Sequence, residues 1–412
     1  MKTYQLCIAI VASILILSSC NDQLPIVTDP KAQITSYHES TLKSENRNAN
    51  FNKSINIYID YSGGMFLPIN QCYDLIDEII TITNKKSTVF YNVGLGEPYK
   101  IKGNILKPNH SKNPRQNSNY TDAESYLDDA IDSITNDYSS QSIFITDFEL
   151  YKNGRFDPSP WATLYFENWL SKGHEIDVFA KEFTNKNSRP QYLYLILFTP
   201  QNYPTDEAVI TRLKAEGYTK KTDLEWFSFS DNLGEIGQNG SYNKLIAPNQ
   251  EFGSDLFAYY EFDLLGIRPV LNNAPLFKNI SFKNTSQVYK DLKIDYELTD
   301  LTDSFSKKGK GENVGKNVFD IGINNNKEVY EFEVKLSDKL NGLRNQRELY
   351  RIDFYLTDAN AGFNEERMDN ILQWTDSNGT TFSSLNKSLQ EAVTRVKLEK
   401  KLLYTYYIEL SI

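Results

Sequence analysis

The segment Asp60–Gly64, Asp-Tyr-Ser-Gly-Gly, holds residue types that suit metal chemistry. It follows a predicted buried strand, residues 54–59, in which isoleucines alternate with other residues. Asp60 and Ser62 therefore lie just past the carboxyl end of a strand, which is where an open α/β sheet binds its ligands. The two glycines allow the backbone to turn sharply and to approach a bound group closely. The segment raises the question whether Asp60 and Ser62 hold a metal ion.

Residues 54 to about 235 alternate between apolar strands and amphipathic helices. The spacing of apolar residues predicts helices at 70–82, 121–134, 161–170 and 205–216. Runs of β-branched and aromatic residues predict strands at 54–59, 87–93, 142–146, 175–183 and 191–199. Strands separated by helices form a largely parallel sheet that is covered on both faces. We therefore expect an α/β domain over residues 54–235.

From about residue 255 the pattern changes to a strict alternation of apolar and polar residues. It predicts strands at 292–298, 330–336 and 350–356, a helix at 384–396 and a closing strand at 404–412. Alternation of this kind is typical of antiparallel sheet with one face in water. We expect a β-rich, antiparallel, sandwich-like domain over residues 255–412. We find no chemical motif and no internal repeat in it.

Three segments of the α/β domain resemble the ligand segments of a von Willebrand factor A domain: Ile59–Met65, Thr121 ahead of a predicted helix, and Ile143–Asp147. The resemblance covers roughly residues 54–235, and the three segments occur in the family's order. It implies a doubly wound, mostly parallel sheet with helices on both faces. It also implies a metal-ion-dependent adhesion site at one edge of that sheet.

The resemblance implies that the metal ligands are Asp60, Ser62, Thr121 and Asp147. Mg²⁺ is the expected ion, because it prefers oxygen ligands and keeps several waters; Mn²⁺ and Ca²⁺ are the alternatives. In the family, the open coordination position accepts an acidic group of a protein partner. The chain departs from the family's Asp-x-Ser-x-Ser pattern at Gly64. One hydroxyl ligand is therefore missing, and we expect weaker metal binding or a water in its place.

Each of these residues also has a purely structural explanation. Asp60 and Ser62 would close a turn by bonding to nearby backbone amides. Thr121 and Glu124 form the pattern of a helix capping box. Asp147 would be a turn residue at the end of a strand. Under this alternative the fold is kept, the metal site has decayed, and the protein is a metal-independent scaffold.

The N-terminal twenty residues resemble the signal of a bacterial lipoprotein. A positively charged start precedes a short apolar run that ends in Leu17-Ser-Ser-Cys20, which resembles a lipobox. We expect removal of residues 1–19 and lipidation of Cys20, which would anchor the protein to the outer membrane of the cell envelope. Residues 20–53 are polar and are predicted to form a flexible tether.

Composition argues against other classes of protein. The net charge is −10 and basic residues are not clustered, so nucleic acid is not an expected partner. Ser62 lacks the glycine that stands two residues before the serine of a nucleophile elbow. The sequence shows neither zinc-ligand spacing nor a phosphate-binding loop. We do not expect an enzyme, and a hydrolase with a metal held by Asp60 and Asp147 is the enzymatic alternative.

The sequence therefore predicts a lipid-anchored, extracytoplasmic protein-binding module. Its partner would be a protein with an acidic group, and its contact with the membrane would be the lipid on Cys20.

Overall fold

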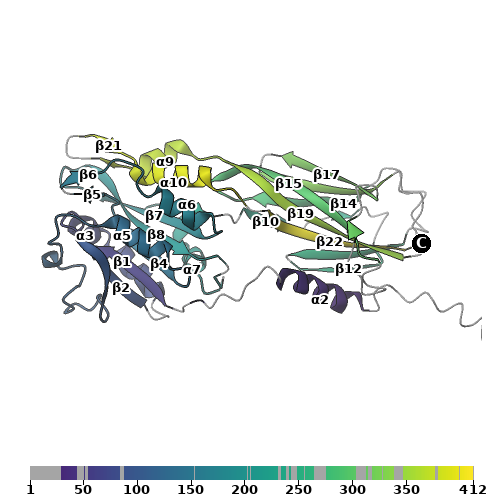
Figure 1. Cartoon of the computed structure of the whole chain (residues 1–412), viewed down its shortest axis with the longest axis horizontal. Coiled ribbons are helices and arrows are strands. Elements are labelled where there is room, and N and C mark those ends of the chain that lie inside the picture. The colour runs from purple at the N-terminus through teal and green to yellow at the C-terminus, as the bar shows by residue number, and fades with distance from the viewer. Residues whose placement is uncertain are drawn as a thin grey trace, which may run out of the picture.

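The computed structural model is an elongated molecule with an α/β part at one end and a β-rich part at the other (Figure 1). It describes residues 29–43, 51, 54–83, 88–152, 154–201, 203–204, 206–230, 233–237, 241–242, 248–254, 256–263, 275–302, 312–313, 318–326, 328–337, 347–375, 379–398 and 400–411. The proposed leader and Cys20 lie outside the described residues. None of the helices in this described part has the length and apolar character needed to cross a membrane.

The α/β part is built on a seven-stranded sheet with the order β3-β2-β1-β4-β8-β7-β9. Its strands are β1 (Ile55–Asp60), β2 (Thr88–Gly94), β3 (Gly96–Ile101), β4 (Gln141–Thr146), β7 (Glu175–Thr184), β8 (Pro190–Thr199) and β9 (Glu225–Phe229). β1 pairs in parallel with β2 on one side and with β4 on the other. The other neighbouring strands pair antiparallel. β1, β2, β4 and β7 therefore run in one direction.

Helices cover both faces of this sheet. They are α3 (Phe66–Gln71), α4 (Tyr73–Thr83), α5 (Leu127–Thr135), α6 (Thr163–Leu170) and α7 (Val209–Ala215). Ile55, Ile57 and Ile59 of β1 share a core with α4 and α7, whereas Tyr58 shares a core with α5 and α6. All six residues of β1 are buried, as expected for a central strand with a helix layer on each side. The predicted α/β class is confirmed.

One part of the sheet differs from the predicted parallel pairing. β7 and β8 are joined by the short turn 185–189, which Asn185 closes by donating its N–H to the carbonyl of Arg189. A parallel pair needs a crossover of a dozen or more residues, so these two strands pair as an antiparallel hairpin. The sheet is therefore mixed, and the doubly wound von Willebrand A-like arrangement stays a prediction.

The β-rich part consists of two sheets that pack face to face. One contains β10 (Gly234–Gly237), β11 (Ser241–Tyr242), β14 (Pro275–Asn284), β17 (Phe319–Asn326) and β18 (Val329–Leu336). The other contains β12 (Gln250–Gly253), β13 (Phe257–Asp263), β15 (Tyr289–Asp300), β16 (Glu312–Asn313), β19 (Arg347–Ala361) and β22 (Lys401–Ser411). Phe332 of the first sheet stacks on Phe354 of the second, with ring centroids 4.4 Å apart. Apart from the parallel pair β13–β22, the described strands of both sheets pair antiparallel.

The segment between β19 and β22 leaves the sandwich and packs on the α/β part (Figure 1). It forms α9 (Glu365–Ile371), the hairpin of β20 (Trp374–Thr375) and β21 (Thr381–Phe382), and α10 (Ser384–Arg395). α10 lies beside α6, where the hydroxyl of Thr163 donates to Glu391 over 3.4 Å. One hydrophobic core runs from α5 and α6 into the sandwich. β10, β11 and β12 precede the expected division at residue 255 but belong to the sandwich sheets, and in space this later segment packs on the α/β part.

Residues 30–43, which the sequence analysis placed in a flexible tether, form helix α2 (Pro30–Lys43) along the sandwich (Figure 1). Ile34 is fully buried among Phe257, Tyr259 and Tyr407. His38 Nδ1 also makes a hydrogen bond of 3.1 Å to the Tyr407 hydroxyl. The helix has few apolar residues, so its periodic pattern is weak. Contact with the sandwich stabilises it instead, which the composition of the segment did not indicate.

Candidate functional site

Asp60 is the centre of a hydrogen-bond cluster at the carboxyl end of β1. Its side chain is 1% exposed. One carboxylate oxygen accepts the backbone N–H of Ser62 at 2.8 Å and the hydroxyl of Ser125. The other oxygen accepts the hydroxyl of Thr146 at 3.2 Å. The turn expected from the structural alternative therefore forms, and two further hydroxyls converge on the same carboxylate.

The second segment of the site is the loop before α5. Gly63 donates its N–H to the Asp122 carbonyl at 2.8 Å, and Ser62 pairs with Asp122 as an isolated parallel bridge. This pairing brings the loop against the Asp60 turn. Ser125, which is 2% exposed, then supplies the hydroxyl that reaches Asp60.

Thr121, the ligand expected from the resemblance, is exposed. The predicted helix at 121–134 begins later, at Leu127, with Tyr126 as its N-cap residue. Thr121 therefore does not cap the helix, and Glu124 accepts a hydrogen bond from the backbone N–H of Gly154 instead. The capping-box explanation is wrong. The hydroxyl that this loop brings to Asp60 is that of Ser125, not that of Thr121.

The third segment is the turn after β4. Asp147 accepts the N–H of Glu149 at 3.1 Å, and Phe148 donates its N–H to the Thr146 hydroxyl at 2.9 Å. Phe148 has a φ of 64°, a left-handed conformation that is unusual for a bulky residue. Its ring stacks on Trp161 at 4.7 Å, which helps to hold this conformation. Asp147 thus lies where the sequence placed it, at the end of a strand adjacent to β1.

The three carboxyl groups of Asp60, Asp147 and Glu149 disfavour one another's ionisation. Burial raises the pKa of Asp147 to about 7, and the charge of nearby Asp60 adds to this shift. Burial also raises the pKa of Glu149 well above its ordinary value, with further contributions from Asp147 and Asp60. For Asp60, burial raises the pKa, while hydrogen bonds from Ser125, Ser62 and Thr146 oppose the shift. A bound cation would favour the ionised form of all three groups.

Exposed apolar side chains surround the same edge of the sheet. Leu95, which lies between β2 and β3, is 58% exposed and Tyr126 is 38% exposed. Leu95 donates its N–H to the Asp122 carboxylate at 3.3 Å, and Tyr126 donates its N–H to the carbonyl of Gly94. Tyr99 on β3 is 50% exposed. These three are among five large apolar side chains exposed in the described part of the chain, the others being Leu164 and Leu256.

The polar side chains at this edge carry the types of atom that bind a hard cation. Carboxylate and hydroxyl oxygens are the ligands that Mg²⁺ and Ca²⁺ prefer. The Ser125 hydroxyl donates to Asp60 and so keeps lone pairs that a cation can take. However, among the described residues, no three His, Cys, Asp or Glu side chains are grouped so as to hold a metal ion. A cation here would depend on hydroxyls and waters for much of its coordination.

Comparison of the chain with family models, with curated proteins and with solved structures gave no match.

Sequence reasoning missed two members of the cluster, Ser125 and Glu149. Ser125 stands immediately before Tyr126 and the buried Leu127, so a helix beginning at 121 would have placed it inside the first turns. Glu149 follows Asp147 by two residues, and only the left-handed turn at Phe148 brings both to one cluster. Neither position carries a local pattern that distinguishes it from an ordinary polar loop residue.

Proposed function

We propose that the chain is a lipid-anchored, extracytoplasmic protein-binding module whose partner docks at the carboxyl edge of β2, β1 and β4. The observation that carries this proposal is the combination found at that edge. Oxygen ligands suited to a hard cation, Asp60, Ser62, Ser125 and Asp147, lie next to the exposed apolar residues Leu95 and Tyr126. Exposed apolar groups gathered beside polar ones are typical of protein-binding surfaces.

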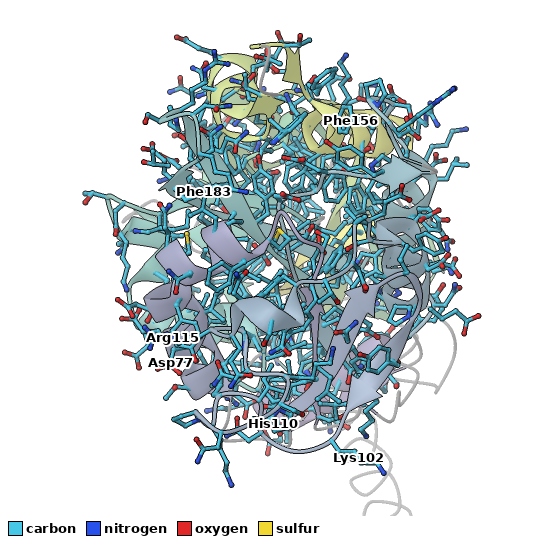
Figure 2. All side chains as sticks on the ribbon, turned by 90° about the vertical axis from the view of Figure 1, so that its left-hand side faces the viewer. Asp77, Lys102, His110, Arg115, Phe156 and Phe183 are labelled. Carbon is cyan, nitrogen blue, oxygen red and sulfur yellow. The ribbon has the colours of Figure 1, made fainter. Side chains whose placement is uncertain are left out.

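The position of this edge in the molecule supports the proposal. Helix α3 and the hairpin of β5 (Tyr151–Lys152) and β6 (Arg155–Phe156) follow β1 and β4, and both lie at the end of the molecule away from the sandwich (Figure 1). Figure 2 looks onto that end, where Phe156, Arg115 and His110 are visible. Helix α2 lies along the sandwich, toward the opposite end. An anchor joined to α2 would therefore leave the proposed docking edge pointing outward.

A divalent cation, Mg²⁺ in the first place, would be held by Asp60, Ser62, Ser125 and Asp147, with waters completing its shell. It would offset the repulsion among the carboxylates and offer a coordination position to an acidic group of the partner.

Gly64 is the position at which one hydroxyl ligand of the expected site is missing. A Cβ added at Gly64 would meet no other atom within 4 Å, and the backbone there is not left-handed. The missing hydroxyl can therefore be restored without disturbing the turn.

Calorimetric titration of Mg²⁺ and Mn²⁺ into the mature protein tests the cation part of the proposal. We expect saturable binding with a Kd of about 1 mM, in the range of weak extracellular divalent sites. Asp60→Asn should abolish binding, and Gly64→Ser should tighten it about tenfold, or about 1.4 kcal/mol. Gly64→Ala is the matched control, because it fills the same space without a hydroxyl. Metal binding that persists in Asp60→Asn would contradict a cation site. An absence of binding in both the native protein and Gly64→Ser would contradict it as well.

A metal-independent scaffold is the second candidate, and the lack of a three-residue acidic or histidine group in the described residues favours it. The same edge would then bind its partner through Leu95 and Tyr126 alone. Chemical cross-linking from a photoreactive residue at position 95, in cells that make the lipidated protein, separates the two candidates. Cross-links that survive chelation of divalent ions support the scaffold, and cross-links that vanish on chelation support cation-dependent binding.

The anchoring part of the proposal rests on the lipobox-like sequence at Leu17–Cys20. Labelling of the protein with a radioactive fatty acid during growth should mark the native chain, and Cys20→Ser should remove the label. A labelled Cys20→Ser protein, or an unlabelled native one, would overturn it.

A further inference from the structure

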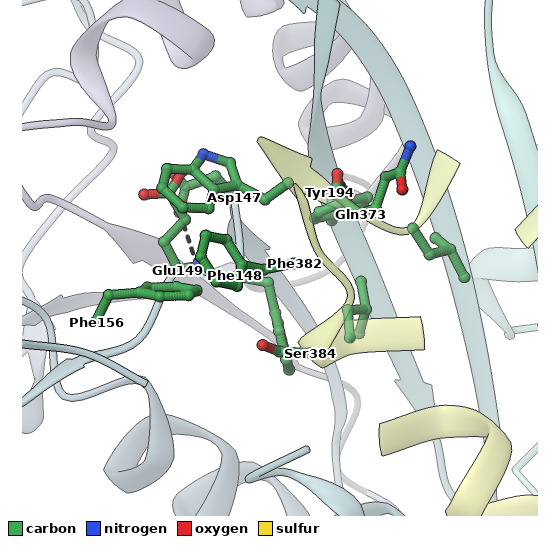
Figure 3. Close-up of a pocket in the computed structure, with 11 residues that line it drawn as sticks. Asp147, Phe148, Glu149, Phe156, Tyr194, Gln373, Phe382 and Ser384 are labelled. Carbon is green, nitrogen blue, oxygen red and sulfur yellow. Dashed lines mark hydrogen bonds between the residues drawn. The ribbon is translucent and has the colours of Figure 1, made fainter. Parts of the chain in front are cut away.

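A small pocket lies between the turn after β4 and the segment that joins β19 to β22 (Figure 3). Asp147, Phe148 and Glu149 form one side, and Gln373 and Ser384 belong to the other side. The space has room for about one water molecule and is partly open to solvent. The pocket thus joins the acidic end of the candidate site to a part of the chain more than 220 residues away in sequence.

Aromatic rings form much of its wall. Phe156 lies 5.0 Å from Trp374 and 4.5 Å from Phe382, measured between ring centroids. Trp374 and Phe382 stack on each other at 5.6 Å. All three rings are partly exposed. The faces of aromatic rings carry partial negative charge and attract cations.

Among the described residues, the acidic groups of the pocket have no basic partner. None of the ion pairs among the described residues involves Asp147 or Glu149. Two carboxyl groups beside aromatic rings, with no lysine or arginine paired to them among the described residues, favour a positively charged occupant.

Ser384 supplies an independent observation. It is 6% exposed, lines the pocket at the start of α10, and its hydroxyl has no hydrogen-bond partner in the described structure. In Figure 3 its oxygen lies toward the side that carries Phe156. A buried polar atom left unpaired costs free energy, and a ligand or a water that bonds to it would remove that cost. The unpaired hydroxyl therefore indicates that the pocket holds an occupant that forms hydrogen bonds.

We propose that this pocket binds a primary ammonium group, as carried by a lysine side chain of a protein partner. An ammonium head is compact, close to a water molecule in size, and donates three hydrogen bonds, so it can serve carboxylates and a hydroxyl at once. A planar guanidinium or a quaternary ammonium is larger than the space available. The proposal deepens the proposed function, on which it rests for the choice of a protein partner, but it does not require a divalent cation at Asp60.

The test is a titration of the full mature protein with n-butylammonium chloride in the presence of a chelator, so that the outcome does not depend on metal binding. Chemical shifts of the tryptophan indole N–H groups report on the pocket, and sodium chloride at equal ionic strength is the salt control. We expect saturable binding with a Kd of about 1–10 mM. Tetramethylammonium and guanidinium should bind at least tenfold more weakly. No saturation up to 100 mM butylammonium, or equal responses to all three cations, would overturn the proposal.

Variants assign the binding to this pocket. Glu149→Gln should weaken butylammonium binding about tenfold and Ser384→Ala about threefold. Ser388→Ala is the matched control for the hydroxyl, because Ser388 is also buried and unpaired on α10 but does not line the pocket. Glu251→Gln, at an exposed position on β12, is the control for charge. If Ser384→Ala and Glu149→Gln bind like their controls, the pocket holds only a water and the proposal is wrong.

Two further probes identify the source of the ammonium group. Nα-acetyl-lysine amide keeps the side-chain ammonium group of lysine. If it binds more tightly than 1,4-diaminobutane, the result would support a lysine of a protein. The reverse order would overturn the choice of a protein source in favour of a free polyamine. Failure of the Mg²⁺ titration leaves all of these outcomes unchanged, so the two proposals can fail separately.

Discussion

Asp177, on β7, is a buried carboxyl group outside the candidate site. It is 1% exposed, and the indole N–H of Trp226 donates to one of its oxygens at 3.0 Å, while the other oxygen has no partner in the described structure. Burial raises its pKa to about 7, and the nearby charge of Glu175 adds to the shift. A carboxyl group whose pKa is raised by folding holds a proton that the unfolded chain releases.

This predicts a specific dependence of stability on pH. Between about pH 4 and pH 7 the folded Asp177 stays protonated while the unfolded one ionises, so its contribution to stability is present at low pH and is lost as the pH rises through about 7. Asp177→Asn keeps the acceptor for Trp226 and removes the ionisation. The variant should therefore be more stable than the native protein at pH 8, by about 2–4 kcal/mol, and the difference should shrink toward pH 4.

Urea unfolding of both proteins at pH 4.5, 6 and 8 measures this difference. Glu182→Gln, an exposed position on the same strand, is the control and should leave the profile unchanged. A constant difference between native protein and Asp177→Asn across the three pH values would contradict the assignment.

At the scale of elements, the segment between β19 and β22 is the feature that joins the two parts of the molecule. Tyr194 of β8 donates its hydroxyl to the carbonyl oxygens of Ile371 at 2.9 Å and of Gln373 at 3.2 Å. Gln191 of the same strand donates to the carbonyl of Thr375 at 2.7 Å. These bonds cap the end of α9 and place the β20–β21 hairpin, including Trp374, beside the pocket.

Tyr194→Phe is expected to loosen this docking without removing the ring from the core. The buried carbonyl of Ile371 and the partly buried carbonyl of Gln373 would lose their donor, so we expect a loss of about 1–2 kcal/mol in the free energy of unfolding. Hydrogen exchange of the amides in residues 365–375 should speed up more than exchange in β1. Tyr192→Phe, two residues earlier and less buried, is the control. Equal protection of 365–375 in Tyr194→Phe and native protein would show that the hydroxyl does not hold the segment.

At the scale of the whole molecule, the long strands β19 and β22 lead from the sandwich to the segment that packs on the α/β part (Figure 1). β19 has 15 residues and β22 has 11, and they pair antiparallel over most of their length. Helix α2 lies along the sandwich at the other end. If the lipid is attached upstream of α2, the sandwich acts as a spacer between membrane and docking edge.

This arrangement predicts that α2 is held by its contact with the sandwich. Ile34→Asp would place a charge in a fully buried position, so α2 should leave the sandwich while the two larger parts stay folded. Limited proteolysis should then cut within residues 30–43 at least tenfold faster than in the native protein. Ser36→Ala, an exposed position on the same helix, should be cut at the native rate. Native protein cut within α2 as fast as Ile34→Asp would show that the helix is not docked in solution.

Local pattern was enough to predict several features of this protein. The alternation of Ile55, Ile57 and Ile59 located β1, and Asp60 and Asp147 were correctly placed at strand ends. The alternation of apolar and polar residues located β15, β18 and β19, although the sandwich sheets already include β10, β11 and β12 ahead of residue 255. These features depend on the burial of residues a few positions apart, which a periodic sequence records directly.

Only the tertiary structure decided which hydroxyl reaches Asp60, how β7 and β8 pair, and where α2 and the segment before β22 pack. Each of these depends on contacts between segments far apart in the chain: Ser125 with Asp60, Tyr194 with Ile371, and Ile34 with Tyr407. A polar loop or a weakly apolar helix carries no local record of the surface on which it packs, because burial by a distant segment leaves short-range periodicity unchanged. The candidate pocket belongs to this second class, since its acidic and aromatic sides meet only in the folded chain.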